Sequence, residues 1–594
     1  TFTNTGIVSG ATSVSAGTLN LNAGSNLSDA AALTVSGGTV NVNTAETVGS
    51  LVANGGTTNV NADLTAGALS GTAGSIVTTG PAGVVAGSAN TSTSFGGVIS
   101  GSGYLQKIGT GTLTLTGANT FAGGTTVTGG TLALTGSGAI SGTSFTIDPT
   151  GTLTSDGGAF TTAASIRNDG AFDLTAGGDE SIANIFNGGT IALSSGSVLT
   201  LNSGASAISG VFSGAGDLTV AGTSATTLSG ANTYTGVTTL TGGTLELQNG
   251  AAIADAGAVV VNAGTLTVTD AETIGSLAGS GGTVQMDANL TTGGNNTSTS
   301  YAGILAGAGT FEKTGSGEMT LTGASTANGT TTVSGGTLTV DGSIASTVVA
   351  VQNAAILKVD GASLADTAAV TLSNTAKLAL SGSETIGSLA GADAGTTVDL
   401  AANTLTTGDA SNTSFGGAIT GTGGLTKQGA GTMTLTNASN SFTGTAQVTA
   451  GTLSVTGAGK LATQSLVTSG SGGLSTDGGA LSSTAAVVNN GSGGLTITGG
   501  NETVASVNGS GGIALASGTL TLLNGASNIS GALSGSGTLT VGGGAVTLSG
   551  ASTNTGEVAV NTGSLTLTGG VGGDVTVGNL AALTVTGGTV GGVT

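Results

Sequence analysis

The chain has 594 residues, with 116 Gly, 2 Pro and 11 Phe, and it contains neither Cys nor His. These absences exclude thiol nucleophiles, disulfide bridges, Cys- or His-based zinc sites and histidine acid–base catalysis. The formal net charge of −21 disfavours nucleic acid as a partner. Apolar residues are frequent but never form a run long enough for a membrane-spanning helix, so we expect no transmembrane segment.

Short segments with alternating apolar residues follow one another along the chain, separated by Gly-rich turns. Between Gly109 and Leu134, for example, the apolar side chains recur at every second position. Leu113 and Leu115 form one such pair, and Leu132 and Leu134 form another. This period is typical of short strands that bury one face. The sequence therefore predicts an all-β fold.

Internal repeats decide between the all-β architectures. The pattern G-[TS]-L-x-[LV] marks six module starts, at Gly17, Gly130, Gly243, Gly336, Gly451 and Gly563. Four of the five intervals are nearly equal, and the interval from Gly243 to Gly336 is about 20 residues shorter. A solenoid can lose one whole turn without losing its other contacts. We therefore predict one continuous right-handed parallel β-helix over residues 1–594. It would have turns of roughly 20 residues, about 28 in all, over roughly 135 Å.

Charged residues recur once per module. A second pattern, E-[TS]-[VI], occurs five times, at Glu46, Glu180, Glu272, Glu384 and Glu502. Each Glu is either a solvated turn acid or an acceptor of backbone N–H groups at a corner. Weak calcium ligation is the more specific functional alternative. Three modules carry a lysine in the pattern [LF]-x-K, at Lys107, Lys313 and Lys427. We interpret these lysines as solubilising charges at strand edges.

Two further sets of side chains occupy matching positions in different turns. Phe121, Tyr234 and Phe442 share one module position. An inward aromatic that fills a corner is the main interpretation, and a carbohydrate-stacking platform is the alternative. Stacked turns also place like residues above like. We therefore expect hydrogen-bonded ladders from four asparagines, Asn41, Asn43, Asn59 and Asn61.

An active site would need converging carboxylates or a basic residue beside a bound cation. Asp179 and Glu180 are adjacent, so a strand would point them to opposite faces. Arg167 has no acid cluster of matching spacing beside it. Five aspartates precede a Gly, which is typical of turns: Asp156, Asp169, Asp341, Asp360 and Asp477. We predict no catalytic, cofactor-binding or metal-binding residues and no cofactor apart from the weak calcium alternative.

The segment from Gly109 to Leu132, GTGTLTLTGANTFAGGTTVTGGTL, resembles the autotransporter-associated β-strand repeat. Similar segments span Leu228–Leu245, Met319–Leu338 and Met433–Leu453, with a weaker one at Val546–Leu565. Such repeats occur in the passenger regions of large secreted proteins of Gram-negative bacteria. The resemblance implies an exported β-helical passenger at the cell surface or outside the cell. Because the sequence begins at Thr1 without Met, we expect a processed product or an excerpt.

Two main functions fit these observations. The first is a non-catalytic, rigid cell-surface stalk that adheres to glycans or proteins of other surfaces through repeated weak contacts. The second is a subunit of an extracellular filament, sheath or matrix that associates end to end or laterally. The residues Ala31–Val40 recur as Ala581–Val590, which motivates the second function. A polysaccharide-active β-helix enzyme is a remote third alternative.

Overall fold

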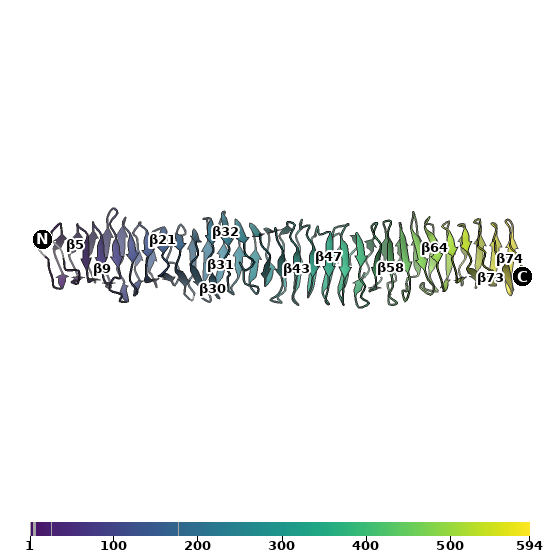
Figure 1. Cartoon of the computed structure of the whole chain (residues 1–594), viewed down its shortest axis with the longest axis horizontal. Helices are drawn as coiled ribbons and strands as arrows, with labels where there is room; N and C mark the ends of the chain where they lie inside the picture. Colours follow the sequence, from purple (N-terminus) through teal and green to yellow (C-terminus); the bar gives the residue numbers. More distant parts are fainter. Residues whose placement is uncertain (1, 4–6, 25–26, 176) are drawn as a thin grey trace. The chain divides into compact units, whose positions relative to one another are not determined.

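The computed structural model describes residues 2–3, 7–24, 27–175 and 177–594. The described residues form 74 strands, β1 to β74, and none of them lies in a helix. The strands are parallel and stack in about 29 turns of roughly 20 residues (Figure 1). The predicted all-β solenoid is confirmed.

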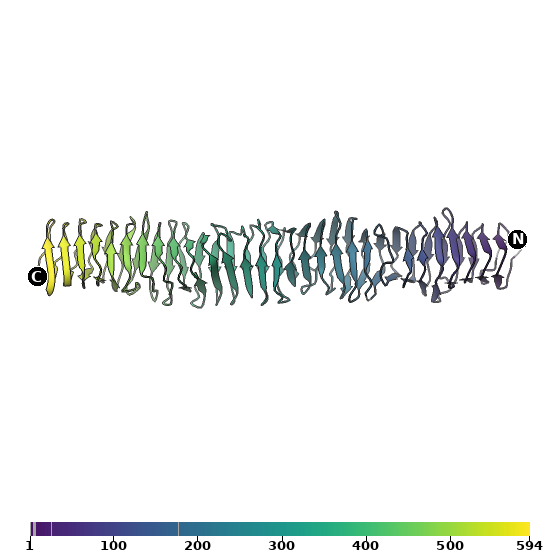
Figure 2. The same ribbon diagram turned by 180° about the vertical axis from the view of Figure 1, so that it is seen from behind.

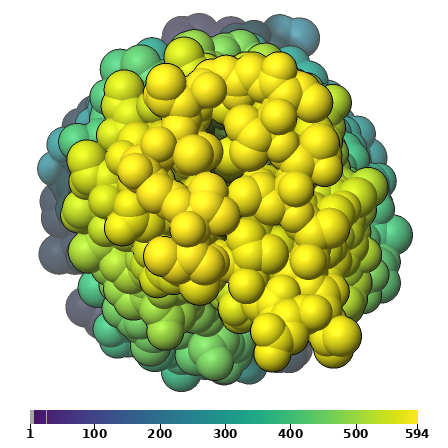
Figure 3. Space-filling view, turned by 90° about the vertical axis from the view of Figure 1, so that its right-hand side faces the viewer, coloured from purple at the N-terminus to yellow at the C-terminus, as the bar shows by residue number. Residues whose placement is uncertain are grey.

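The chain divides into two compact units. The first comprises residues 1–295 and 301–304, and the second comprises residues 296–300 and 305–594. Within each unit, every turn pairs with the turn before it and the turn after it, and the view from behind shows the same stacking (Figure 2). In Figure 3 the C-terminal residues of the second unit, drawn in yellow, lie nearest the viewer.

Three sheets build most of the first unit, and each begins at a different turn of the solenoid. The first includes β3 (Thr18–Leu21), β5 (Thr39–Val42), β8 (Thr57–Val60), β11 (Ser75–Thr78) and β14 (Val98–Gly101). The second runs through β6 (Glu46–Val48), β9 (Leu64–Ala66), β12 (Val84–Ala86), β15 (Leu105–Lys107), β18 (Thr125–Val127), β21 (Ser144–Ile147), β23 (Ser165–Asn168) and β26 (Asn184–Phe186). The third runs through β13 (Thr93–Phe95), β16 (Thr112–Leu115), β19 (Gly130–Leu134), β22 (Gly151–Ser155), β24 (Ala171–Leu174), β27 (Thr190–Leu193) and β30 (Phe212–Gly214).

Later sheets follow the same scheme. A sheet in the first unit starts with β25 (Glu180–Ile182), β28 (Val198–Leu201) and β31 (Asp217–Val220), and another starts with β37 (Glu272–Ile274) and β40 (Leu290–Thr292). In the second unit, one sheet starts with β51 (Glu384–Ile386), β54 (Leu405–Thr407) and β57 (Leu425–Lys427) and ends with β66 (Ser506–Asn508). Another runs from β55 (Thr413–Phe415) to β70 (Leu533–Gly535), and a third begins at β65 (Asn501–Val504) and β68 (Thr519–Leu522).

The core is a narrow column of aliphatic side chains. Along most strands, half-buried and fully buried positions alternate, as the period of two requires. In β16 and β19 the side chains of Leu113, Leu115, Leu132 and Leu134 are at most 2 % exposed. In register, Leu113 pairs with Leu132 and Leu115 pairs with Leu134 of the next turn. The inward positions predicted from the alternation are therefore confirmed.

The six glycines that mark the module starts share one backbone conformation. Their φ angles lie between 60° and 84°, a region that side chains disfavour. At five of the six, a Cβ atom would also lie within 2.5 Å of a carbonyl oxygen of the preceding turn. Gly is therefore favoured at every module start, and at five of the six the preceding turn also leaves no room for a side chain.

The outward asparagines form two ladders in the first unit. Asn59 donates to Asn41 at 2.7 Å, and Asn41 donates to Asn20 at 2.6 Å. In the second ladder, Asn61 donates to Asn43 and Asn43 donates to Asn22, both at 2.8 Å. The predicted ladders are confirmed, and each extends one turn further toward the N-terminus than the four asparagines that the sequence singled out.

Candidate functional site

The five recurring glutamates lie inside the molecule, at most 4 % exposed. Each belongs to a strand at the end of its sheet, namely β6, β25, β37, β51 or β65. The carboxylate accepts hydrogen bonds from backbone N–H groups of the preceding turn. Glu272 binds the N–H groups of Ala252 and Ile253 at 3.2 and 2.8 Å, and Glu502 binds those of Ala480 and Leu481 at 3.1 and 3.0 Å.

The other three glutamates repeat this arrangement. Glu384 binds Ser363 and Leu364, and Glu180 binds Ala159, Phe160 and the hydroxyl of Ser155. Glu46 binds the N–H group of Leu27 at 2.6 Å. The side chain therefore supplies acceptors where a new sheet has only just begun. Of the alternatives left open by the sequence, the corner acceptor is correct and the solvated acid is wrong.

Burial shifts the pKa of four of these carboxyl groups upward, because a charged carboxylate loses its hydration inside the protein. The pKa of Glu272 rises to about 7, and the N–H bonds from Ile253 and Ala252 limit the rise. The nearby carboxylate of Asp255 adds to it. The pKa values of Glu46, Glu180 and Glu384 are raised for the same main reason.

The three recurring lysines are also buried, at 1 % exposure each. The Nζ of Lys107 donates to the carbonyls of Ile108, Gly109 and Gly129 at 2.8, 3.0 and 3.0 Å. Lys313 and Lys427 bind three carbonyls in the same pattern, two from the turn that follows the lysine and one from the next turn. Desolvation lowers the pKa of all three ammonium groups. The prediction of solubilising edge charges is wrong, because these lysines close turns from the inside.

Sequence reasoning missed a buried asparagine two residues before each recurring aromatic. Asn119 Oδ1 accepts the N–H of Ile99 at 2.9 Å, and its Nδ2 donates to the carbonyls of Gly117 and Ala139. Asn232 and Asn440 bind the preceding turn in the same way. The signal was present, since a spacing of two from an inward residue predicts an inward residue.

The recurring aromatics fill the corner beside these asparagines. Phe121, Tyr234 and Phe442 are at most 1 % exposed, so the inward interpretation is confirmed and the stacking platform is wrong for them. The hydroxyl of Tyr234 hydrogen-bonds Thr238. In the first module, Thr125 occupies the position of Thr238, but its buried hydroxyl has no partner because Phe121 carries no hydroxyl.

The side chains considered for catalysis do not converge on one site. Asp179 is exposed and Glu180 is buried, as alternation predicts. Arg167 forms an ion pair with Asp169 at 2.7 Å on the outside of β23. Asp156 and Asp477 each accept a turn N–H from the preceding turn, at Gly136 and Gly457. Over the parts of the chain that the structure describes, no three Asp or Glu side chains are grouped to hold a metal ion.

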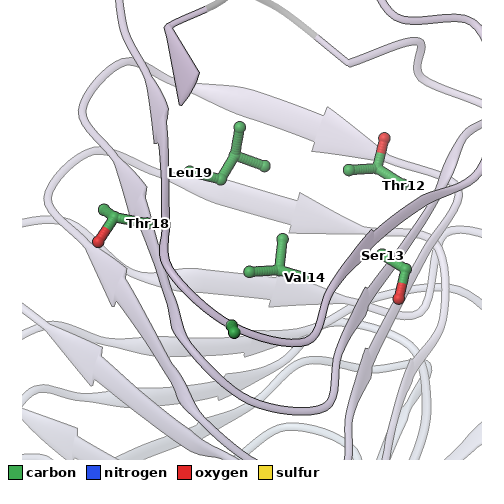
Figure 4. Close-up of a pocket in the computed structure, with 6 residues that line it drawn as sticks. Thr12, Ser13, Val14, Thr18 and Leu19 are labelled. Atoms are coloured by element: carbon green, nitrogen blue, oxygen red, sulfur yellow. The ribbon is translucent and has the colours of Figure 1, made fainter. Parts of the chain in front are cut away.

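The cavities are small and lie near the surface. One of about 220 Å³ is lined by Thr12, Ser13, Val14, Ala16, Thr18 and Leu19 in β2 (Thr12–Val14), β3 and their turn (Figure 4). Another, of about 310 Å³, is lined by Ala45, Asn61, Ala62, Asp63, Pro81 and Ala82. Carboxylate and amide groups line only the second of these two, so it offers more specific hydrogen bonding to a ligand.

Comparison with protein families places the buried corners in a known repeat. Residues 105–148, 213–247, 311–340 and 425–455 match the passenger-associated-transport-repeat. Four segments of the chain are therefore similar to this repeat. Three of the four matched segments contain one of the buried lysines, and three contain an asparagine–aromatic corner. The weaker resemblance at Val546–Leu565 lies outside the matched segments.

The passenger-associated transport repeats fit the passenger of an autotransporter and suggest a secreted, surface-exposed protein. A comparison with curated proteins gave no match to the chain. The described residues contain no helix of the length and hydropathy needed to span a membrane.

Stability is expected to fall as the pH rises through the titration of Glu272. The folded state holds this proton more tightly than the unfolded chain, because the pKa is about 7 in the fold and 4.5 otherwise. The free energy of unfolding should therefore decrease from about pH 4.5 to above pH 7. Urea unfolding followed by circular dichroism across this range measures the slope. The variant Glu272→Gln should flatten it, and an unchanged slope would contradict the assignment.

The variant Phe121→Tyr is expected to stabilise the first module by about 0.5–1.5 kcal/mol. The added hydroxyl can pair with Thr125, as Tyr234 pairs with Thr238. Phe442→Tyr is the matched control, since Ala446 occupies the partner position and leaves the new hydroxyl unpaired. The control should lose about 1–3 kcal/mol. Thermal unfolding of both variants compares them, and equal shifts would refute the pairing.

Proposed function

We propose that the chain is a non-catalytic stalk in the passenger of an exported protein of a Gram-negative bacterium. The observation that carries the proposal is the inward direction of the repeat's charged side chains. The recurring Glu and Lys side chains hydrogen-bond the backbone of neighbouring turns, so these charged groups serve the stacking of the turns. The passenger-associated transport repeats support export to the cell surface.

The outer face supports an adhesive role for this stalk. Half-exposed Thr, Ser and Asn side chains line the strands at every second position, as in β3, β5 and β16. Hydroxyl and amide groups can both donate and accept hydrogen bonds. Weak contacts repeated along many turns add up to strong attachment when the turns are held in one stack.

Three measurements test this function. Beads coated with the purified chain should adhere to surfaces carrying glycans or matrix proteins and should not adhere to bare surfaces. Absence of adhesion on every coated surface would contradict the adhesive role. Light scattering over a concentration series should show a constant mass, whereas growth of the particles would favour a self-assembling filament subunit. Release of reducing ends from polysaccharides would contradict the non-catalytic assignment.

A further inference from the structure

Tyr104 is the one tyrosine of three that is not buried; Tyr234 and Tyr301 are at most 1 % exposed. It lies in the turn before β15, at the corner between the first and second sheets of the first unit. Its ring covers Gly83 of the preceding turn, where a Cβ atom would lie 2.5 Å from the ring carbons. Asp63, one turn further, lies near its hydroxyl: burial first, and then Asp63, raises the pKa of this group. The ring therefore lies over the preceding turn and near the carboxylate of the turn before it.

The depression of about 310 Å³ described above lies next to Gly83, the residue that the ring covers, because Ala82 belongs to its lining. Asp63 and Pro81 contribute to its lining, and both lie in the turns that Tyr104 spans. Asp63 Oδ1 accepts the N–H of Gly83 at 3.0 Å, which holds the carboxylate in place. Asn61, also in the lining, donates to Asn43 and accepts from Thr79, both at 2.8 Å. Carboxylate and amide are thus positioned before any ligand arrives.

The stacking of turns does not require a tyrosine here. The residue before the matching strand is Thr310 before β43 (Phe311–Lys313), Gly424 before β57 and Asp217 in β31. These modules build the same corner with Thr, Gly or Asp. Tyr104 and its neighbouring depression are therefore additions to the repeat, and the repeat's stability does not explain them.

We propose that the Tyr104 ring and the adjoining depression form a binding subsite for a neutral carbohydrate. A sugar ring has an apolar face of C–H groups that can lie against the electron-rich face of an aromatic ring. Its hydroxyl groups can donate to Asp63 and exchange hydrogen bonds with Asn61. The carboxylate and the net charge of −21 disfavour an acidic glycan. The subsite rests on the proposed adhesive function and gives it a ligand class.

Saturation-transfer NMR of the whole chain with maltotriose, mannotriose and N,N′,N″-triacetylchitotriose tests the subsite, with trigalacturonate as the acidic comparison. At least one neutral trisaccharide should receive saturation, and Tyr104→Ala should weaken its binding at least about tenfold. Tyr104→Phe keeps the ring and loses only the hydroxyl, so its binding should lie between that of the unchanged chain and that of Tyr104→Ala. Gln106→Ala is the matched control on β15 and should bind as the unchanged chain does.

Three results would overturn the proposal: no neutral trisaccharide bound by the folded chain, binding unchanged in Tyr104→Ala, or stronger binding of trigalacturonate. Circular dichroism of each variant establishes that it is folded. The bead assay distinguishes failure of the Tyr104 subsite from failure of the adhesive function. Beads carrying Tyr104→Ala that adhere as well as the unchanged chain would refute the subsite and leave the adhesive stalk standing. Failure of both bead preparations would refute the adhesive stalk itself.

Discussion

Replacing Glu502 by alanine is expected to lower the free energy of unfolding by about 2–5 kcal/mol. The substitution leaves the N–H groups of Ala480 and Leu481 buried without an acceptor, and the side chain it removes is fully buried. Urea unfolding gives the overall loss. Hydrogen exchange at these two amides should accelerate more than elsewhere, because each turn contacts only its neighbours.

Two variants make this result specific. Glu502→Gln keeps an acceptor oxygen and should lose less than Glu502→Ala. Glu557→Ala removes an exposed glutamate of the same unit and should change stability by no more than about 0.5 kcal/mol. Similar losses in Glu502→Ala and Glu557→Ala would contradict the view that the buried carboxylate completes the start of a sheet.

Replacing Lys427 by methionine is expected to cost about 2 kcal/mol or more, since hydrogen bonds to charged groups are the stronger ones. Methionine has a similar unbranched length, so the packing changes little, but the carbonyls of Gln428, Gly429 and Ala450 lose their common donor. Urea unfolding and hydrogen exchange in residues 428–431 measure the effect.

A stability of Lys427→Met that is unchanged or higher would also have a physical explanation. Burying an ammonium group costs hydration energy, and apolar replacements of buried charges sometimes stabilise a protein. A variant Lys427→Met that is as stable as the unchanged chain would show that this cost cancels the three hydrogen bonds. Lys358→Met is the control, because Lys358 is exposed on β48 (Ile356–Asp360) and should contribute within about 0.5 kcal/mol.

The sequence predicted the solenoid because alternation and repetition are local signals. The spacing of Leu113 and Leu115 determines which side chains point inward, whatever the rest of the chain does. Gly130 and its equivalents were visible as module starts for a similar reason, since a positive φ leaves Gly as the favoured residue. The ladder of Asn41 and Asn59 followed once the turns were known to stack in register.

The candidate sites were harder to predict because charge and alternation gave opposite answers. Lys107 stands two residues after the buried Leu105, so the alternation along the strand predicted an inward side chain. Its charge predicted exposure, and only the three carbonyls of the folded turns reverse that preference. Glu272 was ambiguous because its partners lie about one turn earlier in the chain. Tyr104 carried no repeated pattern, and its contact with Asp63 depends on a separation of two turns.

The staggered starts of the sheets bear on how each unit carries a pulling force. In the first unit, the sheet through β14 ends at Gly101, while the sheet from β6 continues to Phe186 and the sheet from β13 continues to Gly214. In the second unit, the sheet ending at β66 is likewise overlapped by the sheets through β70 and from β65. At the turns where one sheet ends, backbone pairing therefore continues in the neighbouring sheets. A tensile load along a unit is therefore passed from face to face, and rupture at such a turn requires several ladders to open together.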